Sequence, residues 1–439
     1  MPSPNTFLLL PFLLFMTSPS LSLPPALVAP ISKDHSTLLY SLSLYLKTPL
    51  QPTKLHLDLG AAFTWLDCTK PYYNSSTYLH VPCGSPLCDS FHSFACGNCY
   101  EPPGPHCAND TCSLYPENPV SGKATLDNAL LDALALHTTD GSAPGRLALL
   151  PQFAFSCSTS SLLKGLAKKV NGLVALGRSN HSLPAQVSTA LSLPHYFALC
   201  LSGSVNASGA AFLGSKGPYI FNKIDVSKSL IYTPLVLNPV TRTVVKYGPS
   251  DEYFIGLTAI KVNGKTVPLN NTLLSIDQDS GFGGTTLTTD APYTVMETSI
   301  FKAFVELFVR ESSALNLTRT NVVKPFGVCY LAKDIVSTRA GPAVPTVDLL
   351  MEREDVIWRI LGTNSMVKIS KKGGVELWCL GFVDGGAKPR SSIMIGGHQM
   401  EDNLLQFDLE SKRLGFSSSV LLQGTKCADF NFASAKVNL

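Results

Sequence analysis

The chain carries one order of sequence features twice, and this repetition restricts its possible folds more than any other property does. The alternating apolar run at residues 55–57 predicts a strand that ends at Asp58, and Gly60 allows the backbone after it to turn tightly. A glycine-bounded apolar string then begins at Gly172. The second half repeats this order at Thr288 and Gly396, with separations of 114 residues in the first half and 108 in the second. We therefore predict a duplicated chain with two lobes, for which 439 residues are ample.

The composition favours a mainly β protein. Runs rich in Leu, Val, Ser and Thr are interrupted by 32 Gly and 31 Pro, which are typical turn residues. The formal net charge is only +3, and no cluster of Lys and Arg is interleaved with aromatic residues. Binding to nucleic acid is therefore not expected.

The N-terminus predicts secretion. Residues 1–22 contain no charged side chain and include an apolar run from Phe7 to Met16, followed by small residues up to Ser22. This pattern indicates a signal peptide cleaved near Ser22, and the apolar run is too short for the alternative, a signal anchor. No later run is long and apolar enough to span a bilayer. We expect a secreted protein of the extracellular space, apoplast or cell wall.

The cysteines and the glycosylation sequons agree with an oxidising, extracellular destination. Cys96 and Cys99 could instead belong to a zinc site, but the secretory context favours disulfides, so we expect no metal. The twelve cysteines expected in disulfides are Cys68, Cys83, Cys88, Cys96, Cys99, Cys107, Cys112, Cys157, Cys200, Cys329, Cys379 and Cys427. The six sequons expected to carry glycans begin at Asn74, Asn109, Asn180, Asn206, Asn270 and Asn316.

The loop after residue 57 resembles the first active-site loop of the pepsin-like aspartic proteases, in which Asp-Thr-Gly-Ser follows two apolar residues and a Trp comes shortly after. Asp58 takes the position of the catalytic aspartate and Trp65 that of the aromatic residue. Leu59 replaces the Thr that bridges the two halves of the family's site. Ala61 replaces the Ser or Thr that hydrogen-bonds the aspartate. The loop is thus similar in form but altered in chemistry.

The second active-site loop that this resemblance implies is altered more severely. It should follow the Gly-Gly-Thr sequence at residues 283–285, and there Thr288 takes the position of the second catalytic aspartate. Asp290 lies two residues further on and is a doubtful substitute, because a displacement of about 1 Å can cost roughly a hundredfold in rate. Catalysis in this family needs two carboxylates that share one proton. We interpret the catalytic pair as broken.

The resemblance implies a mainly β, bilobal pepsin-like acid protease fold, with an N-lobe at residues 23–205 and a C-lobe at 206–439. Residues 68–113 should form a Cys-rich surface insertion in the N-lobe, held by disulfides and lacking regular structure. The same fold suggests a disulfide between Cys329 and Cys379 in the C-lobe, and another between Cys200 and Cys427.

Local patterns add further expectations. Asn263-Gly264 between two apolar strings predicts a hairpin. Residues 299–315 predict an amphipathic helix with Ser299 as a possible N-cap. Where proteases carry the flap we find no convincing Tyr, since Tyr115 precedes Pro116 and is poorly placed.

A closer resemblance connects the chain with the plant extracellular dermal glycoproteins, basic 7S globulins, and inhibitors of xylanases and xyloglucan-specific endoglucanases. The sequences that carry it lie at residues 118–120, 292–299, 324–329 and 396–404. It implies a proteolytically inactive monomer that needs no cofactor and inhibits microbial glycoside hydrolases in plant defence. Such inhibitors place C-lobe loops in the hydrolase cleft, where an Arg can bind catalytic carboxylates. Arg339 and Arg390, in the Gly- and Pro-rich loops at 337–342 and 384–390, are the candidates.

Two other functions remain open. An aspartic endopeptidase with residual activity would use Asp58 with Asp290 or another acid. A storage or peptide-binding, receptor-like globulin would share the fold and the secretion. Under the second alternative Arg339 and Arg390 could be replaced without loss of function. We interpret Asp58, His398 and Asp402 as relics or structural residues.

Overall fold

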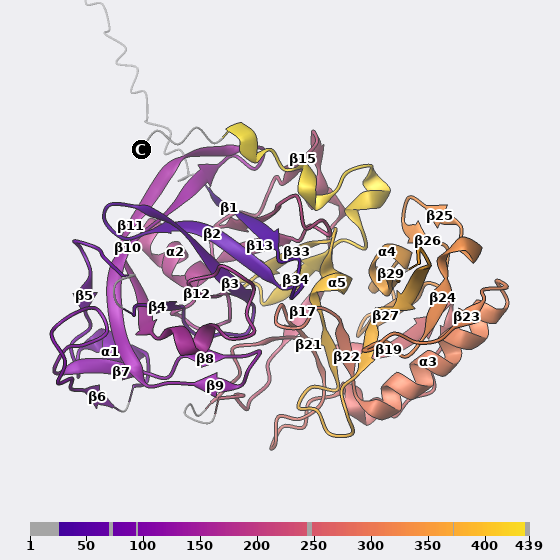
Figure 1. Cartoon of the computed structure of the whole chain (residues 1–439), viewed down its shortest axis with the longest axis horizontal. Helices are drawn as coiled ribbons and strands as arrows, with labels where there is room; N and C mark the ends of the chain where they lie inside the picture. Colours follow the sequence, from indigo (N-terminus) through magenta and orange to yellow (C-terminus); the bar gives the residue numbers. More distant parts are fainter. Residues whose placement is uncertain (1–25, 70–72, 94, 244–247, 372, 435–439) are drawn as a thin grey trace, which may run out of the picture.

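The structure, a computed structural model, describes residues 26–69, 73–93, 95–243, 248–371 and 373–434. The expected signal peptide, residues 1–22, lies outside the described residues. Figure 1 shows two β-rich lobes side by side, the first formed by the N-terminal half of the chain and the second by the C-terminal half. The mainly β, bilobal, pepsin-like fold expected from the sequence is confirmed.

The N-lobe is built on long antiparallel strands that bury alternating or continuous apolar residues. Among them, β10 and β11 form a hairpin over most of their length. The elements of this half are β1 (Ala26–Lys33), β2 (Tyr40–Leu46), β3 (Gln51–Asp58), β4 (Trp65–Asp67), β5 (Leu79–His80), α1 (Pro86–Ser90), β6 (Cys96–Gly97), β7 (Thr111–Leu114), β8 (Glu117–Asn118), β9 (Lys123–Ala124), β10 (Asp127–Thr139), β11 (Pro144–Ser158), β12 (Gly172–Ala175), α2 (Leu183–Leu191), β13 (Tyr196–Cys200) and β14 (Gly209–Leu213).

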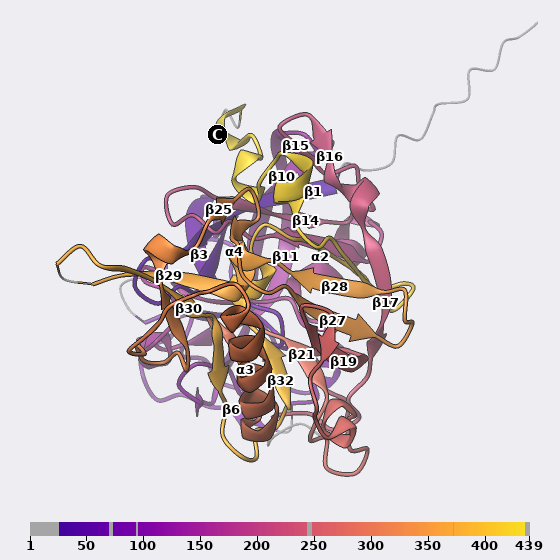
Figure 2. The same cartoon turned by 90° about the vertical axis from the view of Figure 1, so that its right-hand side faces the viewer.

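The C-lobe has shorter strands and the longest helix, α3, which lies across the outer face of this lobe in Figure 2. Its elements are β15 (Ile220–Phe221), β16 (Ile224–Asp225), β17 (Ile231–Val236), β18 (Tyr253–Ile255), β19 (Leu257–Val262), β20 (Lys265–Thr266), β21 (Thr285–Leu287), β22 (Thr294–Met296), α3 (Thr298–Ser313), β23 (Arg319–Thr320), β24 (Cys329–Leu331), β25 (Ser337–Thr338), β26 (Gly341–Pro342), β27 (Val347–Met351), β28 (Ile357–Ile360), α4 (Gly362–Ser365), β29 (Met366–Ser370), β30 (Glu376–Leu380), β31 (Phe382–Asp384), β32 (Ile393–Ile395), α5 (Gly397–Met400), β33 (Leu404–Asp408) and β34 (Arg413–Phe416).

Strand pairing shows the duplication directly. In the N-lobe, β12 pairs parallel with β3 and antiparallel with β4. In the C-lobe, β32 pairs in the same two ways with β21 and β22. A further parallel strand completes each set, since β11 pairs with β4 and β31 pairs with β22. The end of β3 and the end of β21, where the two altered loops begin, are therefore equivalent places in the two lobes.

A continuous ladder of strands joins the lobes. β13 of the first half pairs antiparallel with β33 of the second, from Tyr196 opposite Asp408 to Cys200 opposite Leu404. β14 extends the ladder on one side through its pairing with β13 and β1, and β34 and β17 extend it on the other. β14, which begins after residue 205, thus still belongs to the ladder of the N-lobe. The expected division of the chain between residues 205 and 206 stays a prediction.

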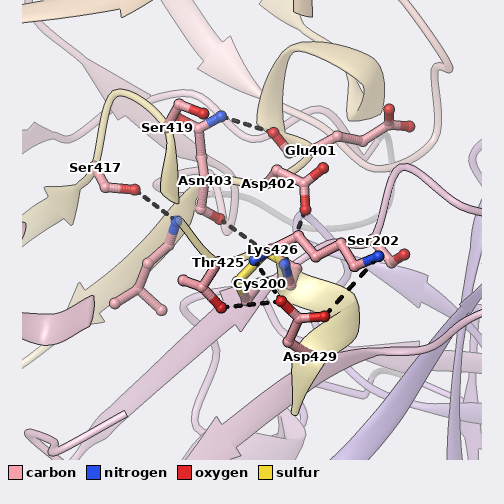
Figure 3. The surroundings of a disulfide bond; sticks show 12 residues. Cys200, Ser202, Glu401, Asp402, Asn403, Ser417, Ser419, Thr425, Lys426 and Asp429 are labelled. Atoms are coloured by element: carbon pink, nitrogen blue, oxygen red, sulfur yellow. Dashed lines mark hydrogen bonds and ion pairs between the residues drawn. A yellow bond between two sulfur atoms is a disulfide. The ribbon is translucent and has the colours of Figure 1, made fainter. Parts of the chain in front are cut away.

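All twelve cysteines form disulfides. The pairs Cys329–Cys379 and Cys200–Cys427, expected from the fold, are present. The second pair fastens the C-terminal tail to β13, and Figure 3 shows Asp402 and Asp429 near it. The other pairs are Cys68–Cys157, Cys83–Cys96, Cys88–Cys112 and Cys99–Cys107.

Two details of the expected secondary structure are wrong. The Cys-rich insertion contains regular structure, because α1 forms there and β7 joins the N-lobe sheet through β10. The N-cap of α3 is Glu297, not Ser299, since the Glu297 carboxylate accepts hydrogen bonds from the backbone N–H groups of Ser299 and Ile300.

The hairpin at Asn263-Gly264 is present, with both residues at positive φ. None of the helices in the described part of the chain has the length and apolarity needed to cross a membrane.

Candidate functional site

Asp58 lies at the end of β3, between the two lobes, and is almost completely buried. Ala175 of β12 is opposite Asp58 in the parallel ladder, and the next backbone N–H, of Leu176, donates to the Asp58 carbonyl at 2.8 Å. One carboxylate oxygen, Oδ1, accepts hydrogen bonds from the N–H groups of Gly60 and Ala61 at 2.6 and 3.1 Å. The other, Oδ2, is buried and has no hydrogen-bond partner among the described residues.

The surroundings of Asp58 favour its protonated form. Burial raises the pKa of the Asp58 carboxyl well above its ordinary value, and the negative charge of Asp290 raises it further. The Arg242 guanidinium and the Gly60 N–H act in the opposite direction. A buried carboxyl with one oxygen bound by backbone N–H groups and the other unpaired is one half of the pepsin-like arrangement.

The second loop supplies no carboxylate at the equivalent position. Thr288 follows β21 there, as expected, and its hydroxyl donates to Asp290 at 3.3 Å. The next residue, Thr289, was missed by sequence reasoning. Its buried hydroxyl donates to the Leu57 carbonyl at 2.6 Å and accepts from the Leu59 N–H at 3.3 Å. Thr289 of the second loop therefore still connects the two loops by hydrogen bonds. Leu59, the equivalent residue of the first loop, has no hydroxyl and cannot make the reciprocal connection.

Asp290 faces a buried histidine that sequence reasoning also missed. His56 Nε2 lies 3.0 Å from Asp290 Oδ1, and His56 is fully buried. His56 precedes Asp58 by two residues on β3, so both side chains lie on one face of the strand. His56 was missed because it lies in an alternating apolar run, where it looked like an ordinary strand residue. The Asp290 carboxylate is thus held by His56 and Thr288, from opposite lobes.

Charged side chains of the second half close the cleft above Asp58. Glu252 Oε1 lies 4.0 Å from Arg242 Nη1, and its Oε2 lies 3.9 Å from Arg390 Nε. A Cβ at Gly60 would lie 3.0 Å from the Glu252 side chain, so only glycine fits easily there. The cavity lined by Asp58, Trp65, Arg242 and Glu252 measures about 60 Å³. This is far below the ~300–1,000 Å³ of typical ligand pockets.

The two candidate arginines lie in different surroundings. Arg390 belongs to the group over the cleft: it is partly buried, and its Nη2 donates to the Val240 carbonyl at 2.5 Å. Arg339 is exposed at the tip of the β25–β26 hairpin, and no described group holds its guanidinium. The Thr338 hydroxyl donates to the Gly341 carbonyl at 2.7 Å, and Thr363 N–H donates to the Ala340 carbonyl at 2.8 Å. The hairpin is therefore braced internally and against α4.

The structure also places the two aromatic residues and the sequon asparagines considered in the sequence. Tyr115, which we considered poorly placed for a flap residue, lines the cavity near Asp58. Trp65 is buried and donates to the Glu117 carbonyl at 2.9 Å. All six sequon asparagines, Asn74, Asn109, Asn180, Asn206, Asn270 and Asn316, are exposed.

His398 and Asp402 belong to the lobe junction, away from the loops that follow β3 and β21. Between them in sequence, Glu401 accepts from Lys33 Nζ and Tyr40 Oη of the N-lobe, both at 2.5 Å. His398 Nδ1 lies 3.2 Å from the other Glu401 oxygen. Asp402 accepts from the Cys427 N–H at 2.8 Å and so holds the C-terminal tail. We call Lys33, Tyr40, His398 and Glu401 the lobe clasp.

Comparison with known proteins agrees with this geometry. Residues 40–215 match the xylanase inhibitor N-terminal family and residues 252–418 the xylanase inhibitor C-terminal family. The chain is 54% identical to a probable aspartic proteinase GIP1 of Glycine max, over 99% of this chain and 98% of that one. It is 38% identical to gamma conglutin 1 of Prunus dulcis, over 94% and 91%.

Solved structures show the same relationship. A crystal structure of edgp superposes with a TM-score of 0.90 at 47% identity, covering 94% of this chain and 99% of the other. Basic 7S globulin from soybean superposes with a TM-score of 0.80 at 33% identity, covering 94% and 100%. The two-lobed architecture, the altered active-site loops and these similarities together show that the chain belongs to the xylanase-inhibitor family of pepsin-like proteins.

Proposed function

We propose that this protein is a secreted, proteolytically inactive inhibitor of cell-wall-degrading glycoside hydrolases of microbes, of the xyloglucan-specific endoglucanase or xylanase type. The observation that carries the proposal is the exposed Arg339 on a braced C-lobe hairpin, in a chain of the xylanase-inhibitor family. Glycoside hydrolases hold two carboxylates in an open cleft. An arginine that enters such a cleft can bind a carboxylate with two parallel hydrogen bonds.

The hairpin is suited to this role because little order has to be gained on binding. The Thr338 hydroxyl and the contact with α4 fix the turn before any partner arrives. A preorganised loop loses less entropy in a complex than a flexible one. Val336 at the base of the hairpin is 71% exposed, so an apolar side chain is available beside the charge. Arg390 is less suitable, since it is already engaged by Glu252 and Val240.

Three observations support the absence of proteolysis. Thr288 offers a hydroxyl where the second carboxylate is needed. Asp290 is engaged by His56, whose Nε2 lies 3.0 Å from Asp290 Oδ1. The cavity over Asp58 measures only about 60 Å³, and the side chains of Arg242 and Glu252 line it.

The test is a set of matched arginine variants assayed for inhibition of purified xyloglucan-specific endoglucanase and xylanase. We expect Arg339→Gln to weaken inhibition by more than ~1 kcal/mol, or about fivefold in Ki. Arg353→Gln, which removes a 72% exposed arginine paired only with Asp355, is the control and should inhibit like the wild type. Equal inhibition by wild type and Arg339→Gln would contradict the assignment of Arg339.

Residual aspartic endopeptidase activity is the second candidate, favoured by the electrostatic interaction of Asp290 with Asp58 and by the relative named a probable aspartic proteinase. This activity predicts pepstatin-sensitive peptide cleavage at acidic pH, which both Asp58→Asn and Asp290→Asn should abolish.

A storage or peptide-binding role, favoured by the gamma conglutin and basic 7S globulin relatives, predicts neither cleavage nor hydrolase inhibition.

Secretion to the extracellular space, apoplast or cell wall is part of the proposal. Six disulfides and six exposed sequon asparagines support it, because both features are typical of chains that pass through an oxidising secretory route. We propose that these asparagines carry glycans and that the protein acts as a monomer.

A further inference from the structure

A second cavity lies beside the cleft, in a part of the N-lobe that the proposed function does not use. It measures about 250 Å³ and lies between the Cys-rich insertion and the loop that follows β12. Phe63, Phe91, Tyr115, Arg178 and His181 line it together with small polar residues. Typical ligand pockets measure ~300–1,000 Å³, so this cavity has room for a single-ring ligand rather than a stretch of peptide.

The walls of the cavity are flat rings held in fixed positions. The Phe91 and His181 rings stack with centroids 3.7 Å apart and an angle of 20° between their planes. Phe63 meets Phe91 edge to face, with centroids 5.8 Å apart. His181 Nε2 is 2.9 Å from the Ser90 carbonyl, and the Cys88–Cys112 disulfide fastens α1, which Phe91 terminates. Aromatic surfaces of this kind favour an aromatic ligand.

Arg178 gives the cavity a positive charge that nothing in the described structure balances. Its backbone N–H donates to the Asp251 carbonyl at 2.9 Å, which fixes the main chain. Its Nη1 atom is buried, and no described group accepts a hydrogen bond from it. Arg178 also lines the cavity, and none of the described residues forms an ion pair with it. A guanidinium is best satisfied by a carboxylate, so an anionic group on a ligand in the cavity would supply the partner.

We propose that this cavity binds a small aromatic carboxylate, with the ring against Phe63, Phe91 and His181 and the carboxylate on Arg178. The site is separate from Arg339 and from hydrolase inhibition, so either proposal can fail without the other. Its position beside Tyr115, which also lines the cleft over Asp58, places the ligand next to the altered active-site loops.

Calorimetric titration with cinnamate and with its uncharged analogue cinnamamide tests the proposal. Wild type should bind cinnamate at least tenfold more tightly than cinnamamide. Arg178→Gln should lose this tenfold preference, whereas the control Arg353→Gln should keep it. Phe91→Ala should weaken both probes, because it removes a wall of the cavity.

Three results would overturn the proposal: no binding of cinnamate to the wild type, equal binding of the two probes, or an unchanged preference in Arg178→Gln. If Arg178→Gln does not fold, the cinnamate-to-cinnamamide ratio of the wild type and the loss of binding in Phe91→Ala still decide the matter.

Discussion

Replacing Glu401 with Gln removes the charge at the centre of the lobe clasp while keeping the size of the side chain. The Glu401 carboxylate is buried and receives Lys33 and Tyr40 from the N-lobe and His398 from the C-lobe. Lys33 is itself only 11% exposed. In the Glu401→Gln variant its ammonium group would remain buried beside a neutral amide. We expect the variant to fold but to be markedly less stable.

Two independent routes give the size of the loss. Burial alone would raise the pKa of Glu401, but His398 and Lys33 outweigh it and lower this pKa from 4.5 to about 2. That difference corresponds to about 3 kcal/mol of stabilisation of the folded state. Breaking a buried ion pair on one side typically costs ~3–5 kcal/mol. Both routes predict a loss of about 3 kcal/mol at neutral pH.

The sign of the pH dependence follows from the lowered pKa. The stabilisation is complete above the unfolded-state pKa of 4.5 and is lost as the pH falls toward about 2. The difference between wild type and Glu401→Gln should therefore shrink to about 1.5 kcal/mol at pH 3.

Urea unfolding followed by Trp fluorescence at pH 7 and pH 3 measures this difference. Glu376→Gln is the control, since its partner Lys368 and Glu376 itself are both about half exposed, and it should cost less than ~1 kcal/mol. A loss below 1 kcal/mol for Glu401→Gln at pH 7, or one that does not shrink at pH 3, would refute the reasoning.

Two other predictions concern the C-lobe. Burial raises the pKa of Asp402 to about 6, so the folded protein holds a proton that the unfolded chain releases, and wild-type stability should fall as the pH rises from about 4 to about 6. Asp402→Asn, which suits the positive φ of this position, should flatten that fall in thermal unfolding between pH 4 and 7; an unchanged slope would contradict the assignment. Gly341→Ala should weaken hydrolase inhibition by displacing the Arg339 hairpin, because Gly341 has φ +93° and a Cβ there would lie 2.3 Å from the Thr363 nitrogen. Inhibition equal to that of the wild type would show that the hairpin conformation is unimportant.

Local patterns in the sequence were sufficient for much of the fold. Alternation along β2 and β3 and the Asn-Gly turn after β19 are short-range signals, and the structure follows them. The start of α3 was misplaced because an acidic side chain, Glu297, can cap a helix as Ser does. The regular structure in the Cys-rich insertion was missed because β7 depends on pairing with β10 rather than on its own composition.

The site was harder to predict because its contacts join distant parts of the chain. His56 and Asp290 are 234 residues apart, and nothing near either residue indicates the other. The Thr289 bridge could have been found, since Thr289 follows Thr288 as Leu59 follows Asp58, and a Thr is what the family has at that position. Arg178 and Glu252 gave no local signal, because their importance comes from burial and from the cavities that they line.

The central claim is tested most directly by incubating the purified protein with a xyloglucan-specific endoglucanase at pH 5 and following hydrolase activity and hydrolase chain length over time. Our proposal predicts immediate, saturable inhibition at near-equal molar amounts, with the hydrolase chain remaining intact. No inhibition, or a progressive loss of activity that accompanies pepstatin-sensitive cleavage of the hydrolase, would contradict it.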